Sequence, residues 1–273
     1  MNYPSLVWKI IATAIAAVAS ILLFPLLGRA QELPAIAADR PGQAAVPAIA
    51  ATGTVEIAMG MQLAGDAPTT GASMRATSLP FAAARIGLLK TMELRLGGEL
   101  RSLNSKIDPA NLDTTISGLA SVTVGTRIGI TPEAGAIPEL SFQMTLGLPV
   151  GQGAFRSASV APSFAFLLHN TLIPDVLNTY ANAGAAWDGT APEGVGTYAA
   201  AIYYNITPAL STFGEFYGAM APQLPPSHSI DGGFAYLVNN NLQLDLFGGV
   251  GLTNNAADYM VSAGFAWRVI AGE

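Results

Sequence analysis

The sequence contains no cysteine, only two histidines and few charged side chains. The absence of cysteine excludes disulfides, thiolate metal sites and cysteine nucleophiles. Charged residues make up 11% of the 273 residues, whereas about a quarter is usual in a soluble domain. Beyond the N-terminus, no apolar run is long enough to cross a bilayer as a helix. The formal net charge is −6 and no basic cluster is present, so we expect no nucleic-acid partner.

Side chains that could carry out catalysis are also scarce. His228 lies beside Ser227 and Ser229, but adjacent residues of a strand face opposite sides, which is poor geometry for a Ser–His pair. His169 lies beside a predicted turn, and we expect a structural or interfacial role for both histidines. No metal-ligand spacing links histidines and carboxylates. The sequence therefore predicts no enzyme, no catalytic residue, no metal and no cofactor.

Residues 1–30 have the pattern of a secretory signal peptide. Lys9 precedes an apolar run from Ile10 to Leu27, and the small residues Gly28 and Ala30 flank Arg29 before a predicted cut. An uncleaved membrane anchor is the alternative, because the run is long for a signal peptide. Pro25, which interrupts the run, favours cleavage.

Residues 31–52 are rich in Ala and Pro and show little periodicity. We interpret them as a flexible periplasmic leader. The same segment could instead enter a barrel lumen as a partial plug, and its sequence does not decide between the two.

Residues 53–273 contain twelve short segments in which apolar and polar residues alternate. In the last segment Val261, Phe265 and Trp267 share one parity, while Ser262 and Arg268 share the other. Side chains of a strand point alternately to its two faces, so each segment predicts a strand with one apolar and one polar face. The predicted strands are 54–63, 79–89, 91–102, 118–130, 139–149, 159–169, 177–187, 195–206, 209–219, 228–238, 241–252 and 258–269.

The twelve strands predict an all-β fold, a closed antiparallel transmembrane β-barrel with apolar side chains toward lipid. The connections support this fold, because short turns such as Asn239-Asn240 alternate with longer ones such as 64–78 and 102–117. This asymmetry places both termini and the short turns on the periplasmic side. A soluble periplasmic β-sandwich is the alternative fold.

The predicted inward-facing charges gather on the first four and the last four strands, which closure of the barrel makes neighbours. They either brace the wall as a salt-bridge network or form a charged constriction that selects solutes. The predicted lumen-lining charged residues are Glu56, Arg85, Glu93, Arg95, Glu99, Arg127, Glu215, Asp231, Asp245 and Arg268.

Several segments resemble a family of outer-membrane transporters described as the Putative MetA-pathway of phenol degradation. The resemblance lies in Leu210–Gly218 (LSTFGEFYG), Ser229–Tyr236 (SIDGGFAY) and the stretch from Asn241 to Arg268, with further matches at Arg85–Gly97 and Leu146–Gly151. It implies a twelve-stranded outer-membrane barrel that admits small, often aromatic or hydrophobic, molecules. The family supplies no catalytic residues to transfer.

From these features we expect a barrel in the bacterial outer membrane that works as a porin-like channel for passive uptake of small molecules. Its expected partners are outer-membrane lipid, the barrel-assembly machinery and small-molecule solutes. A non-conducting structural barrel with a filled lumen is the main alternative, and an outer-membrane barrel hydrolase is a minor one.

Overall fold

The computed structural model describes residues 33–66, 72–107 and 112–270. The predicted signal peptide, residues 1–30, lies outside the described residues. Twelve strands account for most of the described chain, and one short 3-10 helix, η1 (Gly153–Phe155), follows β5. The strands are β1 (Thr54–Gly65), β2 (Ala72–Leu89), β3 (Met92–Ile107), β4 (Leu112–Thr131), β5 (Glu139–Gly147), β6 (Ala161–Ile173), β7 (Leu177–Ala186), β8 (Val195–Asn205), β9 (Leu210–Met220), β10 (Ser227–Asn239), β11 (Leu242–Gly251) and β12 (Tyr259–Ile270).

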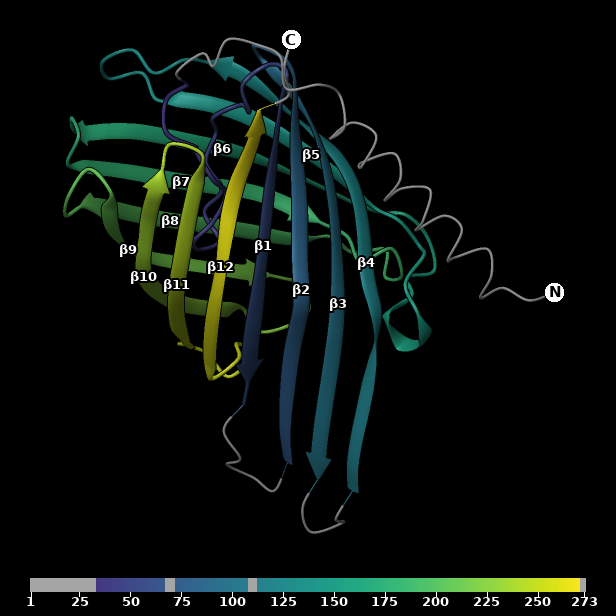
Figure 1. Ribbon diagram of the computed structural model, residues 1–273. Helices are drawn as coiled ribbons and strands as arrows, with labels where there is room; N and C mark the ends of the chain where they lie inside the picture. Colours follow the sequence, from purple (N-terminus) through teal and green to yellow (C-terminus); the bar gives the residue numbers. More distant parts are fainter. Residues whose placement is uncertain (1–32, 67–71, 108–111, 271–273) are drawn as a thin grey trace.

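The strands form one closed antiparallel barrel in sequence order (Figure 1). β12 closes it by pairing with β1 along its whole length, from Thr54 opposite Ile270 to Gly65 opposite Tyr259. Closure leaves no free edge where β1 and β12 meet, and this is how a barrel satisfies the backbone hydrogen bonds of its first and last strands. The predicted all-β barrel of twelve strands is thus confirmed.

Burial alternates along β8–β12 as the sequence parity predicts. On β12, Val261 and Trp267 are exposed on the outside, whereas Met260, Ser262 and Arg268 are buried on the inside. An apolar outer face and a polar lumen are typical of a barrel whose outer surface meets lipid. No helix within the described ranges is long and apolar enough to cross a membrane.

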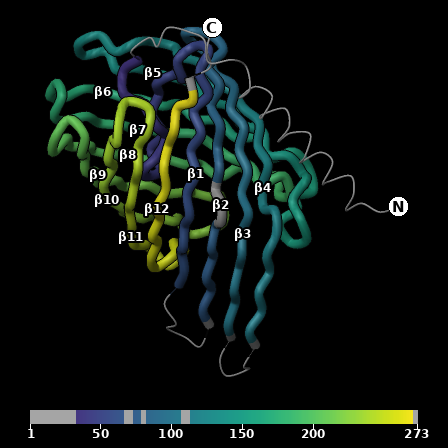
Figure 2. The backbone as a smooth tube through the Cα atoms, in the orientation of Figure 1, coloured from purple at the N-terminus to yellow at the C-terminus, as the bar shows by residue number. Residues whose placement is uncertain are grey.

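Two of the predicted long loops are wrong. The segments 64–78 and 102–117 are largely strand, so β2, β3 and β4 continue well beyond the rest of the wall (Figures 1 and 2). β5 pairs with β4 only over Thr123–Thr131, which leaves the start of β4 without β5 as a neighbour. Residues 113–117 are all exposed, on both faces. The apolar–polar alternation fades where water covers both faces, and periodicity alone therefore missed these extensions.

The interior of the barrel holds the chain that precedes β1. Residues 33–53, here named the plug, wind through the lumen without regular secondary structure (the purple segment in Figures 1 and 2). Ile36, Arg40, Ala44 and Ala50 are buried there. The sequence pattern favours a flexible leader and leaves a partial plug of the lumen as the alternative. In the structure the plug occupies the lumen, because buried side chains of the wall hold its backbone and its two charges.

Candidate functional site: a plug held by buried charges

Arg40 fixes the middle of the plug to β11 and β12. Its guanidinium donates to both carboxylate oxygens of Asp245, with Nη2–Oδ1 at 2.6 Å and Nε–Oδ2 at 3.1 Å. Nη2 also donates to the Ser262 hydroxyl at 3.2 Å, and the cation lies 5.6 Å from the ring centre of Phe247. The amide of Gln243 donates to the Arg40 carbonyl at 2.7 Å. Both charges are buried, and a two-point contact of this kind fixes position as well as charge.

Two glycines make room for this guanidinium. Gly60 of β1 lies directly opposite Gly264 of β12 in the barrel wall. A Cβ added at Gly60 would come within 2.5 Å of Arg40 Nη1, and one at Gly264 within 2.6 Å of Arg40 Nη2. The two missing side chains therefore leave a slot for the Arg40 guanidinium beside the wall.

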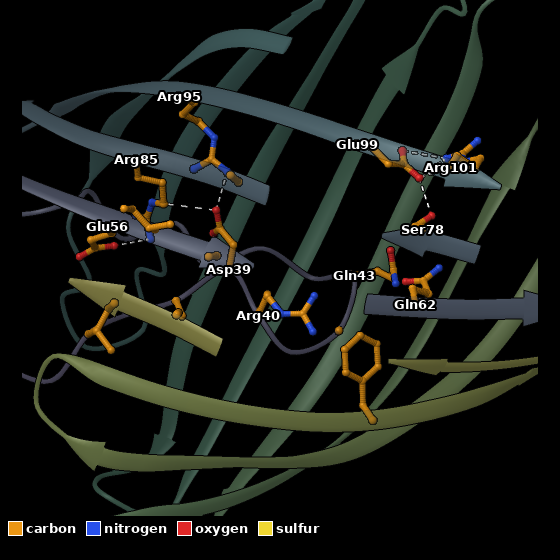
Figure 3. Close-up of a pocket in the computed structure, with 18 residues that line it drawn as sticks. Asp39, Arg40, Gln43, Glu56, Gln62, Ser78, Arg85, Arg95, Glu99 and Arg101 are labelled. Atoms are coloured by element: carbon orange, nitrogen blue, oxygen red, sulfur yellow. Dashed lines mark hydrogen bonds and ion pairs between the residues drawn. The ribbon is translucent and has the colours of Figure 1, made fainter. Parts of the chain in front are cut away.

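Asp39 binds the part of the wall on the other side of β1, through Arg85 of β2, Arg95 of β3 and Arg127 of β4. Figure 3 shows the first two of these contacts. The Asp39 carboxylate lies 2.9 Å from Nη2 of Arg127, 2.5 Å from Nη2 of Arg95 and 3.9 Å from Nε of Arg85. Burial by itself raises the pKa of the Asp39 carboxyl, but the three guanidinium groups outweigh that effect and hold its pKa well below the usual range. Asp39 is therefore a carboxylate at every physiological pH.

Glu93 is the hub of the same cluster. It is fully buried and accepts hydrogen bonds from Arg85 at 2.8 Å and from Arg95 at 2.6 Å. It also accepts from the backbone N–H of Ala50 in the plug at 2.7 Å. Glu56 extends the network, with Oε2 at 3.1 Å from Arg85 Nη1. Buried charges persist only when they are paired and hydrogen-bonded, and these groups are paired with one another and with the plug.

The strands on the other side of the lumen hold the plug by its backbone. Glu215 of β9 accepts from the N–H groups of Gln43 and Ala44, each at 2.7 Å. The Tyr203 hydroxyl donates to the Pro41 carbonyl at 2.8 Å, and the Ser141 hydroxyl donates to the Pro47 carbonyl at 2.6 Å. The plug is thus attached to strands around most of the barrel rather than to one patch of wall.

Seven of the ten predicted lumen-lining charges contact the plug directly. They are Arg85, Glu93, Arg95, Arg127, Glu215, Asp245 and Arg268, the last donating to the Pro34 carbonyl at 2.6 Å. Two of the others pair within the wall, Glu56 with Arg85 and Glu99 with Arg101. Asp231, opposite Glu215, has no hydrogen-bond partner among the described residues. Most of the predicted lumen charges therefore hold the plug, whose position in the lumen the alternation of strand residues does not predict.

Sequence parity missed the plug's own charges and a set of inward aromatic rings. Asp39 and Arg40 are the only charged residues of the plug. Their adjacent, opposite charges inside an Ala- and Pro-rich stretch were the available signal. Tyr203 stacks on Phe213 at 5.0 Å, and Phe213 meets Phe247 at 6.0 Å. Phe213 has the same parity as Glu215, and Phe247 has the same parity as Asp245. This shared parity could have shown from the sequence that the rings face the lumen.

Two cavities beside the plug differ in chemistry. One, of about 360 Å³, lies between the plug and β1–β3 and is lined by charged residues including Glu56, Arg95 and Arg101 (Figure 3). The other, of about 380 Å³, lies toward β5–β10 and is lined by uncharged groups that include Gln143, Leu167, Asn182, Tyr198 and Tyr217. The plug therefore lies between a cavity with charged residues in its lining and a cavity with an uncharged lining.

Neither histidine forms a Ser–His pair in the described part of the chain. Nδ1 of His228 lies 2.5 Å from the Tyr198 hydroxyl. His169 stacks on Tyr180, and its Nδ1 lies 3.6 Å from Oε2 of Glu139. Both rings have structural partners, which agrees with the role expected from the sequence.

Comparison with known proteins supports the fold and adds a family. The sequence profile of the family described as Putative MetA-pathway of phenol degradation matches residues 38–269, so the match begins inside the plug. No curated protein matches the chain by sequence. An outer membrane channel from Pseudomonas putida F1 has a similar structure, with a TM-score of 0.62 and 12% identity over 84% of this chain and 99% of that chain.

Two autotransporter domains also share the architecture. The translocator domain of NalP from Neisseria meningitidis gives a TM-score of 0.53 at 12% identity, over 81% of this chain and 90% of that one. The transport unit of AIDA-I from Escherichia coli gives 0.51 at 9% identity, over 78% and 89%. At these identities the likeness extends to the fold alone.

Proposed function

Because the chain belongs to the Putative MetA-pathway of phenol degradation family, we propose that it is an outer-membrane channel for passive passage of small molecules. The closed twelve-stranded barrel, with apolar side chains outside and charges inside, supports a place in the bacterial outer membrane. Its structural likeness to an outer membrane channel from Pseudomonas putida F1 agrees with that place.

The observation that carries this function is the space beside the plug. The two cavities, of about 360 and 380 Å³, are of the size that holds small molecules. In our proposal a solute passes between plug and wall, and the plug narrows the lumen without filling it. Such a path admits small molecules one at a time and excludes large ones.

The lining of the cavities favours small amphipathic or aromatic solutes. Phe247 and Ile36 line the charged cavity together with Gln62 and Arg101. Tyr217 and Leu167 face the neutral cavity. Apolar faces with a few polar groups bind and orient small molecules of mixed character. The family description, which names phenol degradation, agrees with such solutes.

A non-conducting barrel is the second candidate, and the anchoring of the plug favours it. Asp39 ties the plug to β4 and Arg40 ties it to β11 through buried contacts. The backbone N–H of Ala44, held by Glu215, ties it to β9. A plug held this firmly could close the lumen at rest.

Planar-bilayer conductance of the refolded chain distinguishes the two candidates. We compare the mature chain with a variant that lacks residues 33–50 and retains Ala51–Gly53, since Thr54 and Gly53 depend on that turn. If the chain is a channel, we expect a small but measurable conductance from the intact chain. The variant that lacks residues 33–50 should then give a conductance several-fold larger. No conductance from the intact chain, with conductance only after deletion of residues 33–50, would support the non-conducting barrel and refute passive passage. Swelling of liposomes in arabinose or benzoate then tests which solutes cross.

A further inference from the structure

Glu215 and Asp231 form a pair of carboxylates that stands apart from the rest of the lumen. They lie directly opposite each other on β9 and β10. Directly opposed residues of an antiparallel pair have Cβ atoms about 4.5–5.5 Å apart, so the two carboxylates share one small region. Both residues are more than nine-tenths buried, with exposed fractions of 4% and 7%.

The other carboxylates of this lumen have cationic partners within ion-pair distance. Glu56 and Glu93 pair with Arg85, Glu99 with Arg101, and Asp245 with Arg40. Among the described residues neither Glu215 nor Asp231 has such a partner, and both oxygens of Asp231 are buried without a hydrogen-bond donor. A buried carboxylate without a partner is costly, and two side by side repel each other.

The plug lies against this pair. Glu215 accepts the N–H groups of Gln43 and Ala44, and a Cβ added at Gly42 would lie 3.0 Å from Glu215 Oε2. Gly42 has φ +84°, a left-handed conformation that glycine adopts without strain. Arg40 is engaged by Asp245, which is four residues along β11 from Gly249, the neighbour of Asp231. At about 3.3 Å per residue this separation is roughly 13 Å, too far for Arg40 to serve both sites.

From this arrangement we propose that Glu215 and Asp231 bind a divalent cation of the calcium type, which fastens the plug to β9 and β10. The two charges match a divalent ion, and carboxylate oxygens are ligands of hard cations. Calcium tolerates irregular coordination and accepts water and backbone carbonyls, whereas magnesium demands near-ideal octahedral geometry. The described residues contain no group of three or more His, Cys, Asp or Glu side chains arranged for a metal, so the proposed ion would need water or backbone carbonyls as its remaining ligands. We expect a weak site, with a dissociation constant of about 10⁻⁴–10⁻³ M, the range of extracellular calcium modules.

The sequence predicted no metal because the two ligands come from different strands, sixteen residues apart, and only strand register brings them together. The site does not depend on transport, since a sealed barrel and an open channel could both contain it. A test by binding is therefore separate from a test of the proposed function.

The test is calcium-dependent stabilisation of the refolded full chain in detergent, with circular dichroism to follow thermal unfolding. Calcium chloride at 5 mM, after treatment with a chelator, is compared for the wild type, Asp231→Asn and Glu99→Gln. Asp231→Asn keeps the shape and removes the unpaired charge, so it folds and melts no lower than the wild type without calcium. Glu99→Gln is the matched control, because it also removes one lumen carboxylate but from a pair with Arg101.

We expect calcium to raise the melting temperature of the wild type and of Glu99→Gln, and to leave Asp231→Asn unchanged. Calorimetric titration then gives one site per chain in the first two proteins. Glu215→Gln serves as a second variant and also loses the calcium response. The absence of a calcium effect on the wild type, an equal effect in Asp231→Asn, or loss of the effect in Glu99→Gln would each overturn the site.

Discussion

Replacement of Arg40 by Met tests whether buried charge holds the plug in the lumen. Met retains much of the side-chain volume but removes the cation, so Asp245 is left buried without its partner. Removing one member of a buried ion pair costs about 3–5 kcal/mol. We take the lower value, about 3 kcal/mol, because water can reach Asp245 once the plug moves. Since 1.4 kcal/mol corresponds to about tenfold in an equilibrium constant, the open form of the plug should increase roughly 10²-fold.

The assay uses the absence of cysteine in the natural chain. A single cysteine at Ala44, which is buried against Ala199 and Ala201, reacts with maleimide only when the plug leaves its seat. We expect the labelling rate of Ala44→Cys to rise roughly 10²-fold when Arg40→Met is added. Arg75→Met, at an exposed arginine far along β2, is the control and should leave the rate unchanged.

A double variant makes the prediction sharper. Arg40→Met with Asp245→Asn removes both charges, so no uncompensated carboxylate is left, and labelling should be slower than with Arg40→Met alone. If Arg40→Met changes the rate less than about twofold, buried charge does not hold the plug and our reasoning is refuted.

Three other predictions concern the slot beside Arg40, the outer face of the barrel and the Asp39 carboxylate. Gly60→Ala places a methyl group in the Arg40 slot and should speed Ala44→Cys labelling about tenfold, close to the loss of one charged hydrogen bond, whereas Gly214→Ala, which meets open space, should have no effect. Leu244→Arg puts a charge on the exposed apolar face of β11 and should lower the free energy of unfolding by roughly 2–4 kcal/mol in denaturant titrations. Ser121→Arg, opposite Glu99 on the inner face, should be much milder, and equal losses would mean that the faces are misassigned. Because the pKa of Asp39 is lower in the folded chain than its ordinary 3.8, its contribution is full well above pH 3.8 and is lost as the pH falls below it. The difference in melting temperature between the wild type and Asp39→Asn should thus stay constant from pH 8 to about pH 5 and shrink toward pH 3, and a difference that shrinks above pH 5 would contradict the lowered pKa.

The residues of the lumen show which features strand parity predicts and which it does not. Parity placed Glu93 and Arg127 on the inner face, and both are fully buried there. It could not show that Glu93 joins Arg85 of β2 and the backbone of Ala50, because one contact spans strands and the other reaches the plug. Parity also treats Asp231 and Asp245 alike, although one is paired and the other is not.

The sequence by itself determined the twelve strands, their two faces and the class of barrel, since these depend on local alternation and on turn residues between neighbouring strands. Only the tertiary structure decided where residues 33–53 lie and which charges meet. Those residues have no periodicity, and their position depends on partners such as Asp245, which is 205 residues from Arg40 along the chain. Closure of the barrel brings those partners around one lumen, and there the cost of leaving them unpaired holds the plug in place.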